Sequence, residues 1–164
     1  MQAARQAAKT ILVGLDRIDS VRITEKRKND FVTSVDKAAE HEIISTLQEA
    51  YPGHQFLSEE SFSTTPLNNK DDFWIIDPLD GTTNFIYGIP HFAISIAFMS
   101  KGKLEYGLIY DPLKDELFTA VRGSGARLNQ RRIRVSPRKS LDGALIGAGS
   151  QFETQSLHGV VGGM

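Results

Sequence analysis

The sequence predicts an α+β domain in which two helices pack against one face of a mainly antiparallel sheet. Its N-terminal part places apolar residues at helical spacing, and the remainder holds short apolar runs separated by turn residues. Helices early in a chain followed by a meander of strands favour such a layered arrangement.

Two segments carry the helical spacing. The first, residues 2–18, has apolar side chains three and four positions apart, namely Ala4, Ala8, Ile11, Leu12 and Leu15. The second begins at Ser34, which can cap a helix, and ends before Pro52 and Gly53. Its apolar stripe comprises Ala39, Ile43, Ile44 and Leu47.

The predicted strands follow the second helix. A hairpin is expected from residues 91–100 and 103–111, which flank the turn KGK. The other expected strands are residues 56–60, 73–77, 116–123, 127–136 and 141–149.

Composition sets the class of protein. The chain has 164 residues, a net charge of −1 and no cysteine. One domain is therefore expected, and disulfide scaffolds, thiolate metal sites and cysteine nucleophiles are excluded. The sequence offers no signal-peptide core and no membrane span, so we expect a cytoplasmic protein without a membrane partner.

The segment WIIDPLDGTTNF, residues 74–85, ends an apolar strand in Asp77 and Asp80. The simplest interpretation is a turn stabilised by an aspartate side chain. A second acidic strand end is available at Glu59 and Glu60, and Asp36 lies near the start of the second helix. The sequence thus offers several carboxylates for one site.

Gathered carboxylates repel one another, so a site of this kind needs cations. Oxygen ligands favour a hard ion, and Mg²⁺ is the expected one. Two such ions can hold a phosphate ester and activate water. The residues after Asp80, Gly81 to Asn84, offer backbone N–H groups to an anion. The pattern predicts a metal-dependent phosphomonoesterase.

Three stretches resemble the inositol monophosphatase family of Mg²⁺-dependent, Li⁺-inhibited phosphatases: DPLDGTTNF, the preceding EES, and NDFVTSVD. The resemblance implies the N-terminal helix-pair and antiparallel-sheet portion of a layered αβαβα sugar-phosphatase fold. It also implies hydrolysis of myo-inositol 1-phosphate to inositol and phosphate, two or three Mg²⁺ ions, and a homodimer.

The family pattern implies metal ligands at four positions. These are Glu59, Asp77, the main-chain carbonyl of Leu79, and Asp80, with Asp77 shared between two ions. Glu60 matches a supporting acid next to the ligand Glu59.

The same pattern implies catalytic and substrate-binding roles. Asp36 and Thr82 resemble the pair that activates the attacking water, beside the metal-ligating Glu59. Gly81, Thr82 and Thr83 would present N–H groups to the substrate phosphate. Lys26 resembles a lysine of a mobile loop near a third, weaker ion.

The sequence departs from the family in two places. Ser58 stands where the family usually has glycine. The W-D motif, whose aspartate completes the second ion site, is absent, since Trp74 is the only tryptophan. We therefore expect residues 1–150 to form the metal- and phosphate-binding domain, residues 151–164 to begin a missing or disordered C-terminal portion, and the chain alone to have little or no activity.

Other functions stay open. A sugar bisphosphatase, a bisphosphate nucleotidase or a histidinol phosphatase would share the D-P-x-D-G motif. A non-catalytic role with RNA or RNA polymerase is an alternative, for which arginines between residues 131 and 138 are the local support. We expect His41 and His54 to be surface residues rather than metal ligands, since hard-ion sites prefer oxygen ligands.

Overall fold

The computed structural model describes residues 1–27, 30–61 and 71–147. It divides into two units, residues 1–134 and a second unit that begins at Val135. The predicted domain boundary at residue 150 lies outside the described residues. In the part of the chain that is described, no helix is long and apolar enough to cross a membrane.

A seven-stranded sheet forms the centre of the first unit, and its strands follow one another in sequence order. The first two strands pair in parallel and all others are antiparallel. The strands are β3 (Gln55–Ser58), β4 (Phe73–Asp80), β5 (Ala93–Ser100), β6 (Lys103–Asp111), β7 (Glu116–Val121), β8 (Gly125–Leu128) and β9 (Arg131–Ile133). The predicted α+β class is confirmed.

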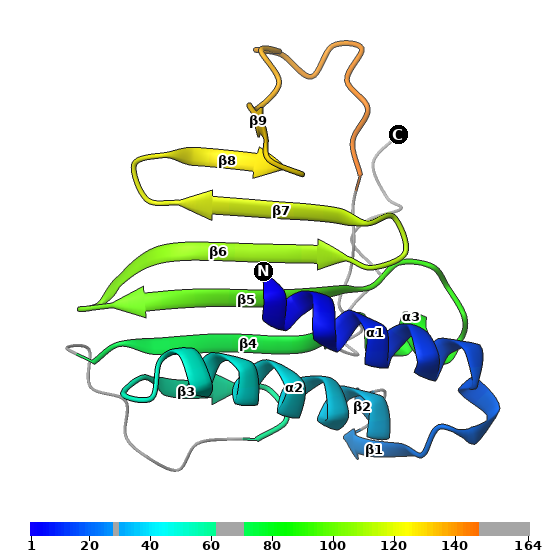
Figure 1. The fold of residues 1–164 in the computed structure, drawn as a ribbon. Helices are drawn as coiled ribbons and strands as arrows, with labels where there is room; N and C mark the ends of the chain where they lie inside the picture. Colours follow the sequence, from blue (N-terminus) through cyan, green and yellow to red (C-terminus); the bar gives the residue numbers. More distant parts are fainter. Residues whose placement is uncertain (28–29, 62–70, 148–164) are drawn as a thin grey trace. The chain divides into compact units, whose positions relative to one another are not determined.

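Helices α1 (Gln2–Asp16) and α2 (Ser34–Ala50) lie side by side over one face of this sheet (Figure 1). The buried stripe of α2 is Val35, Ala39, Ile43 and Leu47, at the spacing that the sequence predicts. Small residues of α1 allow close packing, because a Cβ at Gly14 would lie 2.5 Å from Val35 Cγ2. The two helices therefore cover the apolar side of β4 and β5.

The start of α2 differs from the prediction. Thr33, not Ser34, caps the helix: its hydroxyl accepts hydrogen bonds from the N–H groups of Val35 and Asp36. The Asp36 carboxylate accepts in return from Thr33 N at 2.9 Å, which completes a capping box. Ser34 is already helical, and its N–H donates to Arg22 O at 2.9 Å.

A short hairpin before α2 was not predicted. Strands β1 (Ile23–Arg27) and β2 (Asp30–Thr33) form a separate two-stranded antiparallel sheet. Its charged sequence lacks the apolar alternation that signals a strand. Lys26 belongs to β1, but its side chain lies outside what the structure describes.

Two strand predictions near the end of the described chain are wrong. Residues 127–136 contain a hairpin turn at Asn129 and Gln130, both with positive φ, so one expected strand becomes parts of β8 and β9. The Asn129 side chain fixes this turn by accepting from Leu117 N at 2.9 Å. Residues 141–147 form no strand, and Leu145 and Ile146 are exposed.

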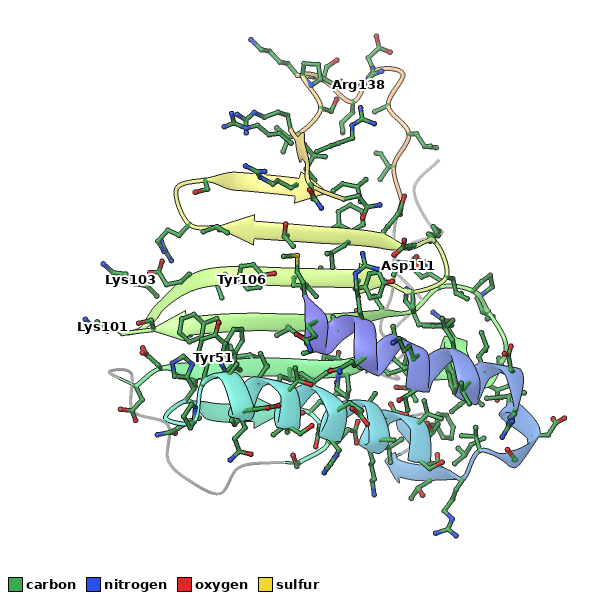
Figure 2. The ribbon with its side chains drawn as sticks, viewed as in Figure 1. Tyr51, Lys101, Lys103, Tyr106, Asp111 and Arg138 are labelled. Carbon is green, nitrogen blue, oxygen red and sulfur yellow. The ribbon has the colours of Figure 1, made fainter. Side chains whose placement is uncertain are left out.

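His54 is only partly exposed, so it is less of a surface residue than expected. Its ring stacks on the rings of Tyr51 and Phe98, and its Nδ1 accepts a hydrogen bond of 3.1 Å from Trp74 Nε1. In Figure 2, Tyr51 and Tyr106 lie toward the end of the sheet where β6 begins, and Asp111 lies at the end of β6. His41 is exposed on α2, as predicted.

Candidate metal and phosphate site

The segment from Asp77 to Asp80 forms an irregular end of β4. Asp77 pairs with Ser95 of β5 and Asp80 pairs with Ala93, so three steps along β4 match two along β5. Pro78 has no N–H to donate, which favours such a bulge. The Asp77 carboxylate accepts from Leu79 N at 3.1 Å, so the simple aspartate turn is present as well.

Asp77 is the electrostatic centre of the site. Its pKa is raised to about 7, first by partial burial and then by the charges of Glu59 and Asp80. A side-chain hydrogen bond with Glu59 raises the pKa further. Two neighbouring carboxylates thus act on the Asp77 carboxylate.

Glu59 follows β3, the strand that runs parallel to β4. Parallel strands bring their carboxyl ends to the same edge of a sheet, so Glu59 and Asp77 meet there. The Glu59 N–H donates to Ile76 O at 3.1 Å, which extends the pairing by one residue. The Glu59 side chain is exposed, whereas Asp77 is partly buried.

Asp36 reaches the same region from α2. It is 1% exposed, and its two oxygens have different partners. Oδ2 accepts from the backbone N–H and the hydroxyl of Thr33, and Oδ1 lies 2.8 Å from Thr82 Oγ1. Thr82 Oγ1 also lies 3.0 Å from Leu79 O, and its single proton serves one acceptor at a time.

Helix α3 (Thr82–Ile86) begins directly after the bulge. Gly81 is its N-terminal cap with φ of 95°, and a Cβ there would lie 3.0 Å from His91 O. Only glycine fits this conformation without strain. The first N–H groups of a helix have no acceptor within the helix. Those of Thr82 and Thr83 could therefore donate hydrogen bonds to an anion.

Within the described ranges, no three His, Asp or Glu side chains are grouped closely enough to hold a metal ion. The donor set nevertheless fits a hard cation, because it consists of carboxylate and carbonyl oxygens. Partial burial and then the charges of Glu59 and Asp80 raise the pKa of Asp77, and a bound cation would offset both effects. Glu59, Asp77, the Leu79 carbonyl and Asp80 are therefore the groups that could hold Mg²⁺.

Sequence reasoning missed one buried carboxylate. Glu40, on α2, is 7% exposed, and its Oε2 accepts from the Ser58 hydroxyl and from Glu60 N, the latter at 3.1 Å. Its position four residues after Asp36, on the same face of the helix, could have indicated that Glu40 also faces the site.

Comparison with known proteins identifies several relatives of this chain. A relative named Nus factor SuhB, from Pseudomonas aeruginosa, is 49% identical over 158 residues, which cover 96% of this chain and 58% of the relative. The solved extragenic suppressor protein SuhB of Bartonella henselae aligns with a TM-score of 0.81 and 45% identity, over 85% of this chain and 54% of that one.

A third relative is the IMPase of Thermotoga maritima. It aligns with a TM-score of 0.74 and 33% identity, over 83% of this chain and 52% of that one. The chain therefore spans little more than half the length of these relatives. Residues 1–159 match the inositol monophosphatase family, and with nearly the whole sequence matched, the chain belongs to that family.

Proposed function

We propose that this chain supplies the metal- and phosphate-binding part of a phosphomonoesterase that hydrolyses myo-inositol 1-phosphate. One observation carries the proposal. The charges of Glu59 and Asp80 act on the Asp77 carboxylate, and the Thr82 hydroxyl contacts both Asp36 Oδ1 and the Leu79 carbonyl oxygen, two residues from Asp77. A solved staphylococcal relative is described as an IMPase complexed with products, which supports the substrate class.

Four oxygen donors would hold Mg²⁺, in two or three sites: the carboxylates of Glu59, Asp77 and Asp80, and the carbonyl of Leu79. When bound, Mg²⁺ would neutralise the carboxylates and polarise the phosphate ester. The N–H groups of Gly81, Thr82 and Thr83 would bind the phosphate oxygens.

Asp36 and Thr82 would move a proton. The Thr82 hydroxyl donates to Asp36 Oδ1 and keeps lone pairs with which to accept a proton from the attacking water. As water attacks phosphorus and the bond from phosphorus to the inositol oxygen breaks, the water proton would pass to Thr82 Oγ1 and the Thr82 proton to Asp36. The departing inositol oxygen would take its proton from solvent water. Thr33 holds the other Asp36 oxygen, so the acceptor is oriented before the reaction.

The test measures ion binding and turnover separately. Calorimetry should detect Mg²⁺ binding to the chain, and Asp77→Asn should abolish it. Phosphate release from myo-inositol 1-phosphate should depend on Mg²⁺ and should be slow, because this sequence lacks the family's W-D aspartate. Absence of Mg²⁺ binding would contradict the function, and turnover like that of a full-length relative would contradict the slow rate.

The substrate has close alternatives. Sugar bisphosphates, bisphosphate nucleotides and histidinol phosphate would meet the same ions and the same N–H groups. A solved relative is described as a dual specific IMPase/NADP phosphatase, so one family site can serve more than one phosphate ester. Parallel assays with these esters would rank them against myo-inositol 1-phosphate.

A second candidate function is binding within a transcription complex, with RNA or RNA polymerase as the partner. The observation that favours it is the name of the relatives, Nus factor SuhB. The exposed arginines of β9, Arg131 and Arg132, would contact RNA phosphates. Asp80→Asn should abolish hydrolysis and leave RNA or polymerase binding intact in a pull-down.

A further inference from the structure

Glu40 lies almost wholly inside the protein, although it is a carboxylate. It is 7% exposed and stands on the face of α2 that meets the sheet. A buried charge persists only where hydrogen bonds replace its lost hydration. Glu40 Oε2 receives two such bonds, from the Ser58 hydroxyl and from the Glu60 N–H at 3.1 Å.

The two donors are the residues immediately before and after Glu59. Glu59 itself donates its N–H to Ile76 O at 3.1 Å, and Ser58 Oγ lies 3.4 Å from the same carbonyl. Glu40 therefore ties both neighbours of Glu59 to α2, while β4 holds the Glu59 backbone. These bonds hold the chain on both sides of the Glu59 side chain.

Asp36 and Glu40 are four residues apart, so they lie one above the other on a single helix face. Asp36 bonds Thr82, which follows β4, and Glu40 bonds the residues around Glu59, which follow β3. One rigid helix thus sets the relative positions of the water-activating pair and of a metal ligand.

We propose that Glu40 is a positioning residue that fixes Glu59 for metal binding, an inference that rests on the proposed function. Glu40 need not touch the ion, because its bonds go to the groups that flank the ligand. Groups of this kind orient ligands and tune affinity for the ion, and their loss weakens metal binding by about 10- to 100-fold.

Ser58 provides an independent way to test the same bonds. It is 3% exposed, and its hydroxyl donates to Glu40 Oε2. Ser58→Gly removes the hydroxyl donor and leaves the Glu60 N–H on Glu40, so it should loosen the strand end less than Glu40→Ala does. Glu40→Gln keeps a neutral acceptor and should lie between Glu40→Ala and the wild-type chain.

The first measurement needs no metal. Amide hydrogen exchange followed by NMR should become about tenfold faster or more at Glu60 in Glu40→Ala, because its acceptor is gone. Exchange at Glu59 should rise as well, while Ile43 in the middle of α2 stays protected. Unchanged exchange at both glutamates, in Glu40→Ala and in Ser58→Gly, would overturn the proposal.

The second measurement is Mn²⁺ binding by EPR titration at a temperature well below unfolding. Glu40→Ala should weaken Mn²⁺ binding by about 10- to 100-fold. The matched control is Glu42→Ala, an exposed glutamate of the same helix, which should bind like the wild-type chain.

The outcomes separate the two proposals. Unchanged Mn²⁺ affinity in Glu40→Ala, with only a lower unfolding midpoint, would mean that Glu40 merely stabilises the fold, and the positioning role would be wrong. Failure of the wild-type chain to bind Mn²⁺ would overturn the proposed function. In that case the exchange measurement would still decide whether Glu40 fixes the backbone around Glu59.

Discussion

The Thr82 hydroxyl lies 2.8 Å from Asp36 Oδ1, although the two residues are 46 positions apart in the chain. The other oxygen of Asp36 is held by Thr33, in the cap of α2. One side chain therefore both completes a helix cap and orients the hydroxyl at the start of α3. The stability of α2 and the geometry of the site are coupled through Asp36.

Thr82→Val keeps the shape of the side chain and removes its hydroxyl. It leaves a buried oxygen of Asp36 without this donor, so the free energy of unfolding should fall by about 1–3 kcal/mol. Phosphate release should fall about 100-fold or more, because proton transfer loses its relay. Urea unfolding and a phosphate assay check the two effects. Thr82→Ser retains the hydroxyl and should remain near wild type; a Val variant as active as wild type would exclude the relay.

Gly81→Ala should destabilise the chain by about 1–3 kcal/mol, because alanine at φ of 95° is strained. The new Cβ would also lie 3.0 Å from His91 O. Urea unfolding measures the loss. Gly53→Ala is the matched control, since its Cβ would meet no atom within 4 Å. Equal stability of the two variants would show that the turn can relax around alanine.

His54→Ala should lower the free energy of unfolding by about 1–3 kcal/mol, because Trp74 Nε1 loses its acceptor. The stacking of His54 on Tyr51 and Phe98 is lost as well. Trp74 is the only tryptophan, so its fluorescence should shift to the red as water reaches it. His41→Ala, on the exposed face of α2, should change neither property; an unshifted spectrum in His54→Ala would contradict the contact.

The metal-free chain should become less stable as pH rises from about 4 to about 7. Asp77 has a pKa of about 7 in the folded chain and an ordinary value of 3.8, so the folded state binds this proton more tightly. The stabilisation is complete below the ordinary pKa and is lost as pH rises through the folded value. Urea unfolding in EDTA at several pH values measures the slope.

Asp77→Asn is the control for this pH dependence, because it cannot ionise. Its unfolding free energy should change less with pH across the same window. A wild-type slope that survives the substitution would assign the pH dependence to other groups.

Local signals predicted most of the fold. The apolar spacing of α2 and the alternation of β5 and β6 are strong, and those elements were expected at nearly their observed bounds. The β1–β2 hairpin lacked such a signal, because its strands are short and charged. The turn at Asn129 depends on a hydrogen bond to Leu117, which no local pattern reveals.

The helix cap illustrates a smaller error. Thr33 and Ser34 both carry a hydroxyl, and either can cap a helix. The presence of Asp36 three residues after Thr33 decides in favour of Thr33, because only that spacing closes a capping box.

The sequence by itself determined the chemistry of the strand end, because Asp77, Pro78, Asp80 and Gly81 are neighbours whose turn is set by local backbone preferences. This stretch, with EES and NDFVTSVD, also carries the resemblance to the family, whose model matches residues 1–159. Only the tertiary structure decided that Asp36 reaches Thr82, that Glu40 bonds the residues around Glu59, and that crowding and burial raise the pKa of Asp77 to about 7. These contacts join residues 18 to 46 positions apart, and they exist because α2 packs across β4.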